Sequence, residues 1–243
     1  WLDQDLWRQW RATLQGRRVF VSDGGGLAIT VARRPGPPKK KLPEVITLQE
    51  EHLVDAPYQI AAGLDVHRRE AVVLDLAGEH RAMLIGGYTG SGKTNLMRSI
   101  VVQLAAKHPA DEVQVAIVDT KEVDFAGPFD HMPQLFQPIA RDQDQAEALI
   151  EQVEAERVRR QAAMARGRVS DWRKLPDPPP LLLLLIDEAA DFTATPAMET
   201  LVQIARKGRA FGVSLVVSTQ YPTKRVIDAQ VRANLTTAVA FPT

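Results

Sequence analysis

The sequence predicts an α/β fold in which a central, mostly parallel β-sheet is flanked by helices. Short apolar runs typical of buried strands alternate along the chain with longer segments of helical periodicity. A glycine-rich loop at 87–94 separates one such strand from one such helix, and a later strand ends in the acidic pair Asp187 and Glu188. Strands that alternate with helices pair in parallel through right-handed crossovers, so these observations favour a single large α/β unit.

The composition excludes several classes of protein. The 243 residues are 45% hydrophobic and 25% charged, which suits one large domain with an appendage or two small domains. Without cysteine the chain has no disulfide framework and no thiolate metal site. Lysine and arginine number 30, as do aspartate and glutamate, so any contact with nucleic acid has to be local. No apolar run reaches the roughly 18–20 residues that a membrane span needs, and no signal peptide is recognisable.

Residues 1–41 are expected to form a small N-terminal appendage. Apolar residues at helical spacing predict an amphipathic helix over 1–15, and two apolar runs around the glycines of 22–26 predict a β-hairpin. Residues 33–41 form a basic, proline-rich linker, which is either solvated or in contact with a DNA backbone. The chain begins at Trp1 and stops at Thr243 just after a predicted strand, so we expect it to be a piece of a longer protein.

Residues 42–243 are expected to form the main domain. Apolar runs predict strands over 60–65, 71–76, 82–85, 113–119, 181–186, 213–218 and 235–241. Helical periodicity predicts helices over 95–106, 143–166 and 197–210, the last ended by Gly212, and a helix or turn over 226–233. The polar, proline-rich segment 167–180 is predicted to be a long loop.

The loop at 87–94 fits the phosphate-binding pattern G-x-x-x-x-G-K-[ST] between a strand and a helix. Its glycines allow backbone N–H groups to converge on phosphate oxygens, and the following helix adds its positive end. We expect Lys93 to reach the β- and γ-phosphates and the Thr94 hydroxyl to ligate Mg²⁺. The predicted nucleotide-binding residues are Gly87, Tyr88, Thr89, Gly90, Ser91, Gly92, Lys93, Thr94 and Asn95.

The acidic pair is predicted to complete the nucleotide site. The carboxyl end of a buried parallel strand faces the crevice in which open α/β sheets bind ligands. Asp187 is expected to hold Mg²⁺ through water, and Glu188 to act as the general base toward the attacking water. The alternative, two surface acids at a strand end, is disfavoured by the complete phosphate loop. Gln220, at the tip of the strand over 213–218, is either a γ-phosphate sensor or an ordinary strand-end amide.

Five segments, in order and spacing, resemble the motor domain of FtsK/SpoIIIE DNA translocases. They are the phosphate loop at 90–94, the strand end at 118–121, the acidic pair with its preceding residue at 186–188, and the blocks 204–215 and 218–222. The similarity covers roughly residues 58–243, and the stretch from 207 to 222 is its most specific part. We expect the strand that carries Asp187 to lie next to the phosphate-loop strand or one strand removed from it.

This resemblance implies a RecA-like P-loop NTPase that hydrolyses ATP with Mg²⁺, assembles as a hexameric ring and moves double-stranded DNA through it. It implies Arg209 as the residue inserted into the ATP site of the neighbouring subunit, where a guanidinium neutralises charge during phosphoryl transfer. A solvated helix arginine is the alternative, and Arg159 and Arg160 are weaker candidates for the same role. The implied location is cytoplasmic, with a membrane anchor or further domains in other parts of the full-length protein.

Some features depart from the family pattern. Tyr88 stands where a small residue is usual, Tyr221 replaces an arginine, and residues 1–57 show no clear match. A DNA pump of conjugation and a secretion ATPase that moves protein substrates are the alternative functions. A degenerate domain that binds nucleotide only for structure is disfavoured, because Lys93, Thr94 and the acidic pair are intact.

Overall fold

The computed structural model describes residues 18–21, 29–32, 54, 56–65, 68, 70–122, 124–193, 195–220 and 233–241. The expected helix over 1–15, the basic linker, Tyr221 and most of the segment 226–233 lie outside these residues. Within the described part of the chain, no helix is long and apolar enough to span a bilayer.

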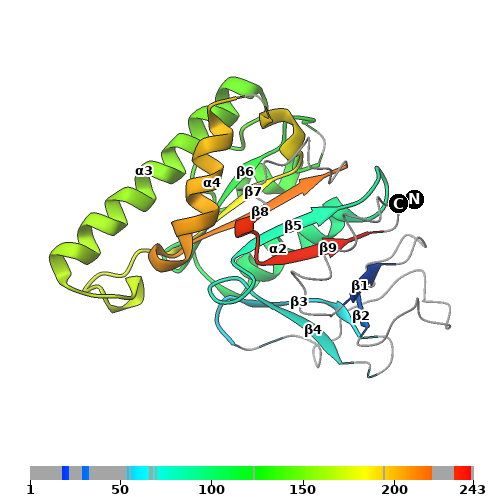
Figure 1. The fold of residues 1–243 in the computed structure, drawn as a ribbon, viewed down its shortest axis with the longest axis horizontal. Helices are drawn as coiled ribbons and strands as arrows, with labels where there is room; N and C mark the ends of the chain where they lie inside the picture. The colour runs from blue at the N-terminus through cyan, green and yellow to red at the C-terminus, as the bar shows by residue number, and fades with distance from the viewer. Residues whose placement is uncertain are drawn as a thin grey trace.

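The fold is built on a five-stranded sheet in the order β6-β7-β8-β5-β9, and every neighbouring pair in it is parallel (Figure 1). Its strands are β5 (Ala82–Gly86), β6 (Val113–Val118), β7 (Leu181–Ile186), β8 (Val213–Thr219) and β9 (Thr237–Ala240). The wholly apolar β7 is buried along its full length, as expected for a strand covered on both faces. The predicted parallel sheet is confirmed, and β8 alone separates the strand that carries the acidic pair from the phosphate-loop strand.

Helices cover both faces of the sheet (Figure 1). The helix α2 (Lys93–Lys107) lies on one face, and α3 (Gln143–Gly167) and α4 (Ala197–Lys207) lie on the other. Successive side chains of a strand point to opposite faces, so Met83 and Ile85 pack with α2 whereas Leu84 packs with α3 and α4. The result is a three-layer α/β/α domain that places the ends of the strands at its edges.

Two antiparallel hairpins accompany the parallel sheet. The predicted N-terminal hairpin is formed by β1 (Arg18–Val21) and β2 (Ile29–Ala32). The other pairs β3 (Gln59–Leu64) with β4 (Ala71–Asp75), and its register shifts between Ala61 and Gly63. Gln103 of α2 binds the backbone N–H and C=O of Ala61 at 2.9 and 2.8 Å, which fastens this hairpin to the helix.

The boundaries of two predicted segments differ in the structure. The helix expected over 197–210 ends as an α-helix at Lys207 and continues as a tighter 3₁₀ turn, η5 (Gly208–Phe211), which Gly212 closes with φ of 68°. A side chain at Gly208 would lie 2.4 Å from the carbonyl oxygen of Val213, so the chain needs glycine there. The expected loop 167–180 contains a short turn, η3 (Trp172–Lys174). The described residues also form the short 3₁₀ turns η2 (Gly127–His131) and η4 (Ala189–Phe192).

Arg160 fastens α3 to the connection between α4 and β8. Its side chain is 1% exposed, and its guanidinium donates to the carbonyl oxygens of Phe211 at 3.1 Å and Gly212 at 2.9 Å. The same guanidinium pairs with Glu156 at 2.8 Å. Arg159 contacts the same carboxylate at 2.6 Å but is 64% exposed. Arg160, one of the weaker candidates for a role in a neighbouring site, is therefore engaged inside its own subunit.

We expect Arg160→Ala to lower the free energy of unfolding by about 3 kcal/mol, because it leaves two carbonyls and Glu156 without their buried partner. The matched control is Arg159→Ala, which removes an exposed contact to the same carboxylate and should cost less than about 1 kcal/mol. Urea denaturation measures both changes. Equal losses for the two variants would contradict a structural role for Arg160.

Candidate functional site

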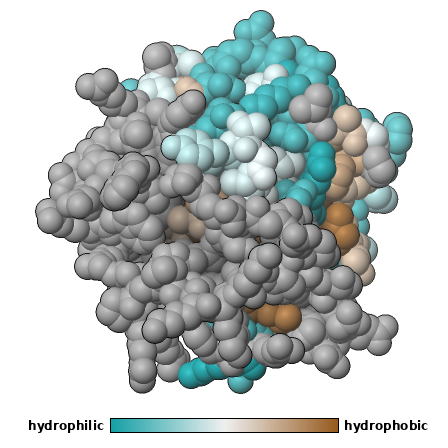
Figure 2. Space-filling model, turned by 90° about the vertical axis from the view of Figure 1, so that its right-hand side faces the viewer, coloured by the Kyte–Doolittle hydropathy of each residue, from teal (hydrophilic) through white to brown (hydrophobic). Residues whose placement is uncertain are grey.

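The predicted site residues gather at the carboxyl edge of the parallel sheet. The phosphate loop follows β5, the acidic pair follows β7 and Gln220 follows β8, and these strands run in the same direction to the same edge (Figure 1). Figure 2 views the molecule from this side, where the described residues toward the top are mostly hydrophilic. The topology therefore brings together groups that are far apart in the sequence.

The phosphate loop has the shape and the free donors that an anion needs. Gly92 has φ of 106°, and a side chain there would lie 3.0 Å from the ring of Phe241; one at Gly87 would lie 2.6 Å from Phe241 Cβ. No side chain caps the N-terminus of α2. The hydroxyl oxygen of Ser91 is buried and has no hydrogen-bond partner among the residues that the structure describes. These orphan groups fit phosphate oxygens of a nucleotide.

Lys93 is held over this loop by the backbone. Its side chain is buried, and Nζ donates to the carbonyl oxygens of Gly87 at 2.6 Å and Tyr88 at 2.9 Å. Burial lowers the pKa of Lys93, whereas the negative charges of Glu188 and Asp187 act in the opposite direction. The ammonium group thus lies between the loop and the acidic pair, where it can exchange carbonyl contacts for phosphate oxygens.

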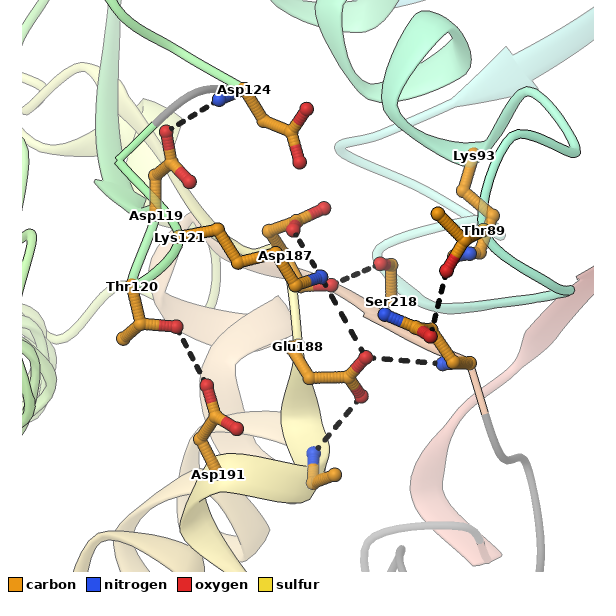
Figure 3. A network of polar contacts seen from close by, with 12 residues as sticks. Thr89, Lys93, Asp119, Thr120, Lys121, Asp124, Asp187, Glu188, Asp191 and Ser218 are labelled. Carbon is orange, nitrogen blue, oxygen red and sulfur yellow. Dashed lines mark hydrogen bonds and ion pairs between the residues drawn. The ribbon is translucent and has the colours of Figure 1, made fainter.

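The acidic pair is buried and is paired with Lys121. Asp187 is 1% exposed, and the Lys121 ammonium lies 3.0 Å from its carboxylate and 3.8 Å from that of Glu188 (Figure 3). Burial tends to lower the pKa of Lys121, but the hydrogen bond and charge of Asp187 outweigh it and raise the pKa. The Ser218 hydroxyl donates to the backbone oxygen of Asp187, which anchors the pair to β8.

Two further carboxylates surround Asp187. Asp119 is fully buried; its Oδ2 accepts the N–H groups of Asp124 and Phe125, and its Oδ1 has no hydrogen-bond partner among the described residues. Burial, and then the charge of Asp187, raise the pKa of Asp124. Carboxylate oxygens of Asp119, Asp124 and Asp187 lie within 4.8 Å of one another. This excess of negative charge and the free oxygen fit a hard divalent cation such as Mg²⁺.

Glu188 and the phosphate loop are joined through Gln220. The Glu188 carboxylate accepts the backbone N–H of Gln220 at 3.2 Å and that of Ala190 at 3.3 Å. The side-chain oxygen of Gln220 accepts the hydroxyl of Thr89, at the tip of the loop, at 2.8 Å (Figure 3). One residue thus touches both the loop that is predicted to hold the nucleotide and the predicted general base.

The structure does not bring Arg209 to this group. Arg209 is exposed and lies before β8, at the amino edge of the sheet, while Gln220 lies beyond its carboxyl end. The seven residues of β8 separate these edges by roughly 20 Å, at about 3.3 Å per residue. Arg209 therefore lies at the edge of the sheet opposite the phosphate loop of its own chain.

Sequence reasoning assigned no role to Asp124 or to the contact between Thr89 and Gln220. Asp124 could have been found from its position, because it follows the predicted strand over 113–119 by a few residues and that strand ends at the carboxyl edge of the sheet. Thr89 and Gln220 are 131 positions apart in the sequence, so no local sequence pattern predicts their contact.

A parallel sheet whose carboxyl edge carries a phosphate loop and a buried acidic pair defines a P-loop nucleotide-binding protein. The model of the FtsK/SpoIIIE family matches residues 41–178, and the chain belongs to this family of ATPases, which implies that it binds ATP.

Known relatives and structures agree with this assignment. The chain is 34% identical over 198 residues to the DNA translocase SftA of Bacillus subtilis and 32% identical over 170 residues to the DNA translocase FtsK of Helicobacter pylori strain J99. These matches cover 76% and 65% of the chain, which spans 20% of each relative.

Two solved structures have the same fold. The conjugation coupling protein TcpA has a TM-score of 0.67 at 18% identity, with 95% of this chain and 68% of TcpA covered. The type VII secretion ATPase EccC of Thermomonospora curvata has a TM-score of 0.62 at 25% identity, with 74% and 23% covered.

The charges around Asp187 predict opposite effects of two substitutions on stability without metal or nucleotide. We expect Lys121→Ala to lower the free energy of unfolding by about 1–2 kcal/mol, because it removes a partly solvent-screened ion pair of a buried carboxylate. Asp124→Asn relieves repulsion and should leave stability unchanged or higher. Urea denaturation in EDTA at neutral pH measures both. A loss in Asp124→Asn as large as that in Lys121→Ala would refute this charge balance.

Proposed function

We propose that this chain is the ATP-hydrolysing motor of a DNA translocase, which works as a hexameric ring around double-stranded DNA. Residues 42–243 form the motor domain in this proposal. The supporting observation is the convergence of Lys93, the acidic pair and Gln220 at one edge of the sheet, in a chain whose relatives are named DNA translocases. The chain spans a fifth of the length of those relatives, and a membrane anchor or further domains of the full-length protein belong to this proposal.

Each residue of the site has a role in this proposal. Lys93 and the loop N–H groups bind the phosphates of ATP. Thr94 and, through water, Asp187 would hold Mg²⁺, which would neutralise phosphate charge. Glu188 accepts a proton from a water molecule whose oxygen forms a bond to the γ-phosphorus. The bond from that phosphorus to the bridging oxygen breaks, and ADP leaves with the electron pair.

Two further residues, Gln220 and Arg209, couple ATP hydrolysis to the neighbouring subunits of the ring in this proposal. The contacts of Gln220 support a role as γ-phosphate sensor, because its side chain binds Thr89 of the loop and its backbone N–H binds the Glu188 carboxylate. Arg209, exposed at the opposite edge, supplies positive charge to the site of the neighbouring copy.

Two related functions use the same motor. A pump for conjugative DNA transfer is the first, and the fold of TcpA is compatible with it. A secretion ATPase that moves protein substrates is the second, and the 25% identity to EccC favours it as the candidate from another class. Stimulation of ATP turnover by duplex DNA separates the DNA pumps from the protein pump.

We expect Glu188→Gln to bind ATP as the wild type does and to lose DNA-stimulated turnover by about 10²–10⁴-fold, because the amide cannot accept the proton from water. Phosphate release with duplex DNA present measures turnover, and a fluorescent ATP analogue measures binding. Glu151→Gln, on the exposed face of α3, is the control and should match the wild type. Retained DNA-stimulated turnover in Glu188→Gln would exclude this residue as the base.

A further inference from the structure

Lys121 lies beside the carboxylates that fit a divalent cation, yet the proposed hydrolysis gives it no role. It stands three residues beyond β6, in a turn that the N–H of Glu122 closes by donating to the backbone oxygen of Asp119 at 3.0 Å. The Thr120 hydroxyl donates to the carboxylate of Asp191 at 2.6 Å, which joins this turn to η4. The backbone at the base of the Lys121 side chain is therefore held at the carboxyl edge of the sheet.

The ammonium end of Lys121 reaches solvent, whereas its carboxylate partners do not. The Lys121 side chain is 37% exposed, and those of Asp187 and Glu188 are 2% and 8% exposed. A lysine side chain is flexible, and solvent screens part of the attraction in a half-exposed ion pair. Lys121 can therefore leave the carboxylates without opening the core, while the carboxylates stay in place.

No other cation in the described part of the chain takes the place of Lys121. The ammonium group of Lys93 donates to two carbonyl oxygens of the phosphate loop. Arg141 approaches the Asp119 carboxylate at 3.9 Å, but its closer partner is Asp130. Among the described residues, Lys121 alone forms an ion pair with the acidic pair (Figure 3).

A divalent cation at this cluster would compete with the ammonium group. An ion that Asp187 holds, directly or through one water molecule, lies within about 8 Å of Lys121 Nζ, which is 3.0 Å from the Asp187 carboxylate. Like charges at such a distance repel, and a partly buried site screens them only weakly. The ion and the ammonium group also draw on the same negative charge, so binding of one weakens binding of the other.

We propose that Lys121 is an internal counter-cation, which neutralises the acidic pair in place of a divalent metal ion and is displaced when Mg²⁺ binds together with ATP. The inference rests on the part of the proposed function in which Asp187 holds Mg²⁺, and it is independent of DNA and of the ring. It deepens that function by adding a residue that controls when the metal enters the site.

The exchange links the metal to the nucleotide. Mg²⁺ alone would have to displace the ammonium group without any new negative charge at the site. ATP brings the charge of its phosphates, which attracts the ion and offsets the loss of the contact between Lys121 and Asp187. When nucleotide and metal leave, Lys121 returns to the carboxylates. The site thus binds metal tightly only when it also holds nucleotide.

Binding of Mn²⁺ to the whole chain in the absence of nucleotide tests the proposal, with the free ion measured by its electron paramagnetic resonance signal. Lys121→Met keeps a long side chain but removes the charge, so it should bind Mn²⁺ at least about 10-fold more tightly than the wild type. Lys121→Arg keeps the charge and should match the wild type. Lys174→Met removes the same charge from an exposed position on η3 and should also match it.

Urea denaturation with and without Mg²⁺ gives a second readout that needs no activity. A ligand that binds only the folded chain stabilises it, and more so when it binds more tightly. Mg²⁺ should therefore raise the denaturation midpoint of Lys121→Met by more than that of the wild type or of Lys174→Met. The same experiment shows whether each variant is folded.

Three outcomes would overturn the proposal while the proposed function stands, provided that an ATP analogue binds the wild type more tightly in Mg²⁺ than in EDTA. The first is equal Mn²⁺ affinity in Lys121→Met and the wild type. The second is weaker binding in Lys121→Met, which would make Lys121 a support of the metal site. The third is tight binding in Lys121→Arg, which would exclude charge as the cause. A wild type whose analogue binding does not respond to Mg²⁺ would remove the role of Mg²⁺ in the proposed function together with this inference.

Discussion

The position of β8 between β5 and β7 is the constraint on which the candidate site depends. In the parallel register Gly86 pairs with Thr219 and Ile186 pairs with Val217, so the strands that carry the loop, the acidic pair and Gln220 end side by side. A slip of one residue would turn the side chains of β8 to the opposite faces of the sheet. The apolar run of β7, buried along its full length, keeps that strand in the interior of the sheet.

Charge is divided between the two edges of the sheet. At the carboxyl edge, Lys93 and Lys121 face a larger group of carboxylates, which leaves a surplus of negative charge that suits a divalent cation. At the amino edge, Arg81 and Arg209 share a cavity whose lining also includes Asp75, Asp111, Glu112 and Asp171. In the proposed ring, copies that dock amino edge to carboxyl edge would bring Arg209 of one copy to the ATP of the next. A heterologous contact of this kind closes into a ring when its rotation allows.

Features that depend on a local sequence pattern could be predicted from the sequence alone. The parallel strands, the phosphate loop and the acidic pair could be predicted because each is a continuous run with its own periodicity or spacing. The place of β7 one strand away from β5 was among the expected arrangements. Three features depend on distant segments meeting: the pairing of Asp187 with Lys121, the approach of Asp124 to Asp187, and the contacts of Arg160 with the backbone of 211–212. Arg159 and Arg160 are neighbours in the sequence and both pair with Glu156, yet the Arg159 side chain is exposed and that of Arg160 is buried.

The central claim, that this site drives movement of DNA in a ring, is tested most directly by ATP turnover with and without long double-stranded DNA. The mass of the same sample is measured in the presence of a non-hydrolysable ATP analogue. The account predicts a hexamer whose turnover rises several-fold when duplex DNA is added. A hexamer whose turnover does not respond to DNA would contradict it and favour the protein pump.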